Sequence, residues 1–280
     1  MAEVDDFEQV RNDPDPIRRG QRATSLMTVY QQRATELARI RRAAIDQAHD
    51  EFGLPYKDIA EQLGLTKGRI TQIRATAPPA ERAFFGVGPV SVGIPRRVGF
   101  EEGRQRLYFD ASDQASADAI DTTLARLALA TSRFPIDSNL AEIPEGDCVV
   151  ICGPKSAPIA RHLLEGDTSF NIEQDDNGWC IVDARTDLRH YSPFRENSAN
   201  HVDLGYFSRR IEDNGRVIVH IAGLTAVGSL GVAHWLDTNI ATLYDPASRT
   251  LVSGVVRCEF DSSHTITGST LSVGPYSSPE

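Results

Sequence analysis

The stretch 55-PYKDIAEQLGLTKGRITQIRATAP-78 carries the most specific structural signal in the chain and predicts two short helices joined by a tight turn. Pro55 suits a helix start, Gly64 can supply the turn, and Thr66 is a natural N-cap for the second helix. Apolar residues at helical spacing are expected to face inward; they are Ile59, Ala60, Leu63, Leu65, Ile70 and Ile73. This is the organisation of a helix-turn-helix.

The outward face of the second helix has side chains that are suited to DNA. Arg69 can bond guanine bidentately, Gln72 can pair with adenine, and Lys67 can hold a phosphate. The expected DNA-binding residues are Lys67, Gly68, Arg69, Thr71, Gln72 and Arg74. The alternative is a helical hairpin with a solvated basic face. Because one copy covers a single segment of major groove, binding to double-stranded DNA predicts a homodimer.

One long amphipathic helix is expected before this pair, from about residue 22 to residue 52. Its apolar residues recur at spacings of three, four or seven; they are Leu26, Tyr30, Leu37, Ile40, Ala44, Ala48 and Phe52. This helix is a candidate dimer surface, although packing within the monomer fits the pattern equally well. We therefore expect a flexible acidic arm over 1–15, a helical helix-turn-helix domain over 16–78, and a linker or hinge over 79–88.

The charge distribution limits where a polyanion can bind. The chain of 280 residues has a net charge of −10, but residues 16–82 contain 12 basic and 7 acidic residues. A polyanion therefore meets a favourable potential only in this middle part. No apolar run is long enough to span a bilayer, and the acidic start MAEVDDFEQV is not a signal peptide, so a cytoplasmic location without membrane contact is expected.

Residues 89–272 show a different periodicity. Short apolar runs such as 147-DCVVIC-152 and 217-VIVHIA-222 alternate with helical patterns such as 226-AVGSLGVAHWLDTNIATLY-244. Strands that alternate with helices imply crossover connections. The expected fold class is thus an all-α N-terminal helix-turn-helix domain followed by an α/β domain, Rossmann-like and with a mostly parallel sheet. Residues 273–280 are expected to form a loose tail.

Two loops in this α/β part share one design, an apolar strand that ends in glycine and polar residues before a helix. At the carboxyl ends of parallel strands, exposed N–H groups and the helix dipole favour an anion. The expected ligand is small and anionic or nucleotide-like. Its predicted contacts in the loops are Gly153, Pro154, Lys155, Ser156, Gly223, Leu224, Thr225, Gly228 and Ser229. In both loops an ordinary structural turn remains an alternative.

The segment 190–215 lies between the two loops and adds three expected ligand contacts, Asp203, Tyr206 and Arg209. Arg209 is the best anion clamp if it faces inward. The alternative is a polar surface connection. No residues are assigned a catalytic role, because the glycine-rich loop lacks the P-loop lysine and the nucleophile-elbow glycine. No metal site is expected, since the four cysteines form no C-x-x-C pair.

The run YKDIAEQLGLTKGRITQI resembles the sigma-factor-like helix-turn-helix of many bacterial regulators. Together with 79-PAERAFFGVGPVSVGIP-95, 151-ICGPKSAP-158 and 222-AGLTAVGSLGVAHWL-236, it resembles a group of actinobacterial DNA-binding proteins with a C-terminal sensor-like domain. The resemblance spans the chain from about residue 40 and implies a transcriptional regulator. It implies no particular ligand.

Three functions follow from these patterns. The first is a DNA-binding transcriptional regulator whose C-terminal domain senses a small effector. The second is an adaptor whose acidic body binds a protein partner. The third is an enzyme acting on a nucleotide or nucleoside, with the helix-turn-helix as a tether.

Overall fold

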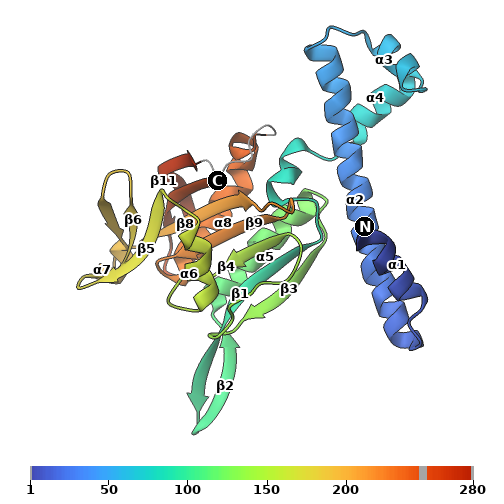
Figure 1. Cartoon of the computed structure of the whole chain (residues 1–280). Helices are drawn as coiled ribbons and strands as arrows, with labels where there is room; N and C mark the ends of the chain where they lie inside the picture. Colours follow the sequence, from blue (N-terminus) through green and yellow to red (C-terminus); the bar gives the residue numbers. More distant parts are fainter. Residues whose placement is uncertain (1, 246–250, 279–280) are drawn as a thin grey trace.

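A single eight-stranded sheet forms the centre of the computed structural model, which describes residues 2–245 and 251–278 (Figure 1). The strand order is β11-β10-β8-β9-β4-β1-β2, and β3 also pairs with β1. The bounds of its strands are Val90–Glu101 (β1), Arg104–Phe109 (β2), Thr131–Ile136 (β3), Cys148–Ile151 (β4), Val202–Ile211 (β8), Val217–Gly223 (β9), Leu251–Phe260 (β10) and Ile266–Ser278 (β11).

The central strands are apolar throughout because both faces of the sheet are covered. In β4, Val149 and Ile151 belong to one core cluster, whereas Cys148 and Val150 belong to another on the opposite face. Successive side chains of a strand point to opposite faces, so a strand covered on both sides reads as a continuous apolar run. This explains why the run at 147–152 is recognisable from the sequence.

The predicted fold class is wrong about the directions of the strands in the sheet. Only β1, β3, β4 and β9 pair in parallel, whereas β8 runs antiparallel to both β9 and β10, and β10 runs antiparallel to β11. The sheet is therefore mixed, and it is not the mostly parallel Rossmann-like sheet that was expected. The error arises at β8, whose polar sequence resembles a surface connection although the strand lies inside the sheet.

Helices cover one face of this sheet and a second, smaller sheet covers part of the other. On the first face lie α5 (Ala111–Arg126), α8 (Ala226–Leu243) and the short 3-10 helix η1 (Ala80–Phe85), which all contribute to one core cluster. On the second face lie α6 (Pro158–Glu165) and a three-stranded antiparallel sheet. The strands of that sheet are Phe170–Asp175 (β5), Gly178–Asp183 (β6) and Leu188–Tyr191 (β7), followed by the short helix α7 (Pro193–Glu196).

The N-terminal part is built on a single long helix, so the predicted fold class, an all-α helix-turn-helix domain, is also wrong there. Helix α2 (Pro16–Asp50) projects beside the body, with α3 (Tyr56–Gln62) and α4 (Lys67–Thr76) at one end and α1 (Ala2–Arg11) beside the other (Figure 1). At 1.5 Å per residue, its 35 residues extend about 52 Å. Its C-terminal part shares a core with α3 and α4, whereas its middle contacts η1.

Three segments that were expected to be a flexible arm, a linker or hinge, and a loose tail have defined structure where they are described. In the expected acidic arm, α1 packs on α2, and Asp13 accepts hydrogen bonds from Arg18 at 2.7 and 2.8 Å. The expected linker contains η1, whose Phe84 and Phe85 are fully buried. The expected tail continues β11, paired with β10 as far as Ser278; the rest of that tail, residues 279–280, lies outside the described residues, as does Met1.

The distal part of β1 and all of β2 form a hairpin that projects from the body (Figure 1). Residues directly opposite each other lie on the same face, so Val98, Phe100, Leu107 and Phe109 share one face. That face is open to solvent, with Phe100 78% exposed. Within residues 2–245 and 251–278, none of the helices combines the length and the apolar character that a membrane span requires.

Candidate functional site

Helix α4 is held against α2 and α3 by a small apolar core. Ile70 and Ile73 of α4 pack with Ile45 of α2 and Ile59 of α3, and all four are almost completely buried. The Thr66 hydroxyl caps α4 by accepting a hydrogen bond from the Arg69 amide at 3.2 Å. The inward residues therefore fix which face of α4 is presented to solvent.

The residues expected to contact DNA all lie on the surface of α4. The exposed set is Lys67, Gly68, Arg69, Thr71, Gln72 and Arg74. Arg69 Nη1 donates a hydrogen bond of 2.6 Å to Gln72 Oε1, so these two side chains lie side by side. Both are exposed, and the bond between them can be exchanged for bonds to a partner at little cost.

Arg74 has a different environment from the other five. Its Nε donates to Asp46 Oδ1 of α2 at 2.6 Å, and its guanidinium lies 4.5 Å from the centre of the Tyr56 ring. The bond to Asp46 raises the pKa of Arg74. Arg74 thus ties the end of α4 to α2 and to the start of α3.

The two glycine-containing loops meet, as expected, at the carboxyl ends of neighbouring parallel strands. Lys155 Nζ donates a hydrogen bond of 2.9 Å to the Leu224 carbonyl, which links the first loop to the second. A Cβ atom placed on Gly153 would lie 3.7 Å from the Gly223 carbonyl oxygen. Burial lowers the pKa of Lys155, and the nearby charges of Arg195 and Arg97 lower it further.

The donors of the second loop are bonded within the protein. The Gly223 amide donates to Ser229 Oγ at 2.9 Å, and the Leu224 amide donates to the Leu204 carbonyl at 3.0 Å. The Thr225 amide and hydroxyl both donate to Asp203 Oδ2, at 3.1 and 2.6 Å. Asp203 is completely buried, so its carboxylate supplies the negative charge that the start of α8 favours.

The glycines of this loop allow α8 to lie close to the sheet. A Cβ atom on Gly228 would lie 2.3 Å from the Leu204 carbonyl oxygen, and one on Gly205 would lie 2.5 Å from the Gly228 carbonyl oxygen. A Cβ atom on Gly231 would overlap Cys258. Close packing of helix against strand therefore accounts for the small residues in 222-AGLTAVGSLG-231.

The three contacts expected from segment 190–215 do not come together. Tyr206 faces the side of the sheet opposite to Asp203, and its hydroxyl donates to Asp167 Oδ2 at 2.8 Å. Arg209 shares the face of Asp203, but six residues of strand, about 20 Å, separate the two. Since β8 is antiparallel to β9, Arg209 lies at the opposite end of the sheet from the loops.

Three charged side chains near Lys155 were not predicted from the sequence. They are Arg97, Asp113 and Arg195. Arg97 Nη2 donates to Asp113 Oδ2 at 2.8 Å, and burial of Asp113 raises its pKa. Arg97 lies on β1 and Asp113 in the first turn of α5, so no local sequence pattern joins them.

Arg82 of η1 connects the long helix to the body. This fully buried side chain donates to Gln32 Oε1 of α2 at 2.9 Å and to the carbonyl oxygens of Leu127, Ala128 and Val87 at 3.1, 2.6 and 2.5 Å. Its Nε also lies 3.7 Å from Glu36 of α2. The buried guanidinium of Arg82 therefore bonds to both helix α2 and the body.

Two further groups secure η1 and the residues that follow it. Arg209 donates to the carbonyl oxygens of Phe84 at 3.0 Å and Ala83 at 3.2 Å. Asp147 Oδ2 accepts hydrogen bonds from the amides of Val87 and Gly88, at 2.7 and 2.8 Å. The segment expected to be a hinge is thus a packed connection.

The reactive groups near the loops are poorly placed for nucleophilic chemistry. Burial raises the pKa of Cys152 and that of Cys258 to about 12, which keeps both thiols protonated. Burial lowers the pKa of His220 to about 4, and its Nε2 lies 2.8 Å from the Cys152 carbonyl oxygen. In the part of the chain that the structure describes, no group of three or more His, Cys, Asp or Glu side chains could hold a metal ion.

Comparisons of this chain with protein-family models, with curated proteins and with solved structures gave no match.

Proposed function

We propose that this chain is a DNA-binding transcriptional regulator whose α4 enters the major groove. The observation that carries the proposal is the division of α4 into two faces. Ile70 and Ile73 are buried, while Arg69 and Gln72 stand together in solvent. Arginine and glutamine are the residues that bond guanine and adenine edges bidentately. Lys67, at the start of the same helix, is placed to contact a phosphate.

The charge distribution supports the same orientation on DNA. Residues 16–82 contain 12 basic and 7 acidic residues, whereas residues 83–280 contain 16 basic and 26 acidic residues. DNA therefore attracts the helical part and repels the body. The middle of α2 contacts the body, while α3 and α4 lie at its end, so the acidic surface is held away from the duplex (Figure 1).

A second copy of the chain is part of this proposal. Tyr30, Leu37 and Ile40 of α2 are 41%, 66% and 47% exposed, so packing within one chain does not cover them. Pairing of α2 with α2 of a second copy would bury these side chains and place two α4 helices on one duplex. The result would be a two-fold symmetric operator.

The body is connected to the helical part at two points, which gives an effector a route to α4. One is Arg82, with its bond to Gln32. The other is Arg39 of α2, whose pKa is raised chiefly by its bond to Glu36 and also by Tyr244 at the end of α8. A ligand that shifts α8 would therefore bias the position of α2 and the spacing of paired α4 helices.

Fluorescence anisotropy with DNA from the chain's own upstream region tests the proposal. We expect Arg69→Ala with Gln72→Ala to weaken binding at least about tenfold, since each bidentate pair contributes about 1–3 kcal/mol. The matched control is Arg104→Ala with Gln105→Ala, the same two residue types at the exposed tip of the hairpin. Equal affinities of the two double variants at one salt concentration would sink the proposal.

A further inference from the structure

Helix α2 has a stripe of exposed residues on the side that faces away from the body. Its members recur at alternating spacings of three and four, which places them on one side of the helix; they are Met27, Tyr30, Ala34, Leu37, Arg41 and Ala44. Met27 and Leu37 are 60% and 66% exposed. The residues that contact the body, Gln32 and Glu36, lie on the opposite side of α2. This alternation is that of a two-helix coiled-coil seam, so the stripe is suited to pairing with a second helix.

Two copies of α2 can meet along this stripe in either direction, and Arg41 distinguishes the two directions. In a parallel pair each residue of the stripe faces the same residue of the other copy, so Arg41 would face the partner's Arg41 within the seam. In an antiparallel pair the first residue of the stripe faces the last, and the second faces the fifth. Arg41 then faces the partner's Tyr30, whose ring attracts a guanidinium, instead of a like charge. The charges therefore favour the antiparallel pair.

The antiparallel register also matches the sizes of the side chains. Ala34 would face the partner's Leu37, and Ala44 would face the partner's Met27, so a small side chain meets a large one at each of these levels. A parallel pair would instead place Ala34 against the partner's Ala34 and leave a gap there, which a closely packed contact avoids. Size and charge thus select the same orientation.

A small apolar hollow beside the stripe supports this register. It lies between α2 and α3, and its lining includes Ala44, Ile45, Ile59 and Leu63. Leu63 is 51% exposed there. Because the antiparallel register brings the partner's Met27 to Ala44, it also brings this side chain beside the hollow. Methionine is unbranched and flexible, and it fills irregular apolar gaps of this kind.

We propose that two copies of the chain pair through the stripe of α2 in antiparallel orientation, with Arg41 of each copy on the Tyr30 ring of the other. The contact covers the exposed apolar residues of the stripe in both copies. The opposite side of each α2 stays on its own body through Arg82.

This orientation fixes the distance between the two α4 helices. The two-fold axis passes midway between Ala34 and Leu37, and Ile45, which packs against α4, lies about 14 Å from it along the helix. With about 8–10 Å between the axes of paired helices, the two α4 helices are about 30 Å apart. Half-sites for helix-turn-helix dimers are about 34–36 Å apart, one turn of DNA. The half-site spacing rests on the proposed function, whereas the pairing of α2 does not.

Cysteine cross-linking under oxidising conditions tests the orientation. All four cysteines of the chain are buried, so the introduced cysteines are the accessible ones. Met27→Cys together with Ala44→Cys should give a covalent dimer on a non-reducing gel, because the two positions face each other in the antiparallel pair. Met27→Cys alone should give none, since the same position of the partner lies about 26 Å away along the helices. A covalent dimer of Met27→Cys alone, or none of the double variant, would overturn the proposal.

Sedimentation equilibrium of the full chain measures the strength of the pairing. At micromolar concentration the wild type should have twice the 30.7 kDa mass of one chain. Ala34→Glu, which places a carboxylate at the centre of the seam, should raise the Kd of the dimer at least about tenfold. The matched control is Ala43→Glu, the same change at an exposed position of α2 outside the stripe, and its Kd should stay within about twofold of the wild type.

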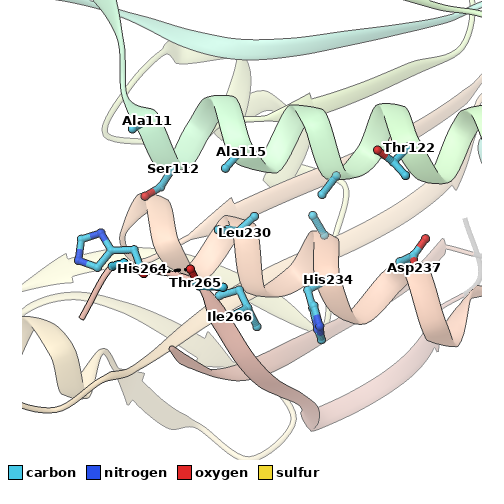
Figure 2. Close-up of a pocket in the computed structure, with 13 residues that line it drawn as sticks. Ala111, Ser112, Ala115, Thr122, Leu230, His234, Asp237, His264, Thr265 and Ile266 are labelled. Atoms are coloured by element: carbon cyan, nitrogen blue, oxygen red, sulfur yellow. Dashed lines mark hydrogen bonds between the residues drawn. The ribbon is translucent and has the colours of Figure 1, made fainter. Parts of the chain in front are cut away.

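A second control addresses the body. Figure 2 shows the groove between α5 and α8, whose mainly apolar walls include Ala115 and Leu230 and offer another surface on which two copies could meet. Ala115→Glu should leave the dimer intact. A monomeric wild type, or a dimer that is lost in Ala115→Glu and kept in Ala34→Glu, would overturn the proposal. A chain that pairs as proposed but binds no DNA would refute the proposed function and leave the pairing standing.

Discussion

Replacing Arg82 by Met tests whether one buried guanidinium joins the long helix to the body. Methionine has a similar length but donates no hydrogen bonds, so the substitution leaves the carbonyl oxygens of Leu127, Ala128 and Val87 and the Gln32 side chain without this donor. Each such loss costs about 1 kcal/mol or more, and breaking a buried charged pair costs about 3–5 kcal/mol in total. We therefore expect the free energy of unfolding to fall by about 3–5 kcal/mol.

Urea unfolding and thermal unfolding followed by circular dichroism measure this loss. A fall of 3–5 kcal/mol corresponds to a Tm lower by roughly 10 °C for a chain of this size. The control is Arg133→Met, because Arg133 bonds two carboxylates, Asp118 and Asp121, but lies at the surface. Its loss should cost at most about 1 kcal/mol. The reasoning is refuted if Arg82→Met is as stable as the control variant.

Two further predictions concern the body and the long helix. Gly228→Ala should destabilise the protein by about 1–3 kcal/mol, because its Cβ atom would lie 2.3 Å from the Leu204 carbonyl oxygen, whereas Gly20→Ala on open α2 surface should stabilise it by about 0.5–1 kcal/mol. Urea midpoints compare the two, and equal effects would contradict the packing argument. His220 stays neutral in the folded chain down to its pKa of about 4, while the unfolded chain takes up the proton below about pH 6.5. The free energy of unfolding should therefore fall by up to about 3 kcal/mol as the pH drops from 6.5 to 4, and His220→Gln should remove that part of the slope; an unchanged slope would exclude His220 as its source.

Local sequence patterns predicted the helices and strands whose buried side chains are all apolar. The two helices at 55–78 follow from apolar residues that face α2, and the structure buries Ile59 and Ile70 as expected. The run at 217–222 is buried on both faces and forms β9. In such segments the burial of apolar side chains dominates, so the spacing of apolar residues is sufficient to predict the helix or strand.

Strand β8 shows why the sheet could not be predicted. It lies between β9 and β10, but Asp203, Ser208 and Arg209 give it the composition of a surface segment. Each polar side chain on it is buried against a specific partner, such as Thr225 for Asp203 and the carbonyl oxygens of η1 for Arg209. These partners are distant in sequence, so the polar pattern hides the strand, and with it the antiparallel half of the sheet.

The same cause limited prediction of the ligand site. The motif 222-AGLTAVGSLG-231 looks like an anion cradle because glycines and hydroxyl groups precede a helix. In the structure the Thr225 amide of this motif donates to Asp203, and Gly228 allows α8 to pack closely against β8.

Selection of DNA from a random pool tests most directly whether α4 reads base edges. The wild type should enrich a two-fold symmetric sequence that contains a fixed guanine in each half. Arg69→Ala should lose the preference at that guanine alone, whereas Lys67→Ala should weaken binding to all sequences and reduce the salt dependence by about one phosphate contact. Enrichment of no sequence by the wild type, or of the same sequence by Arg69→Ala, would contradict the account.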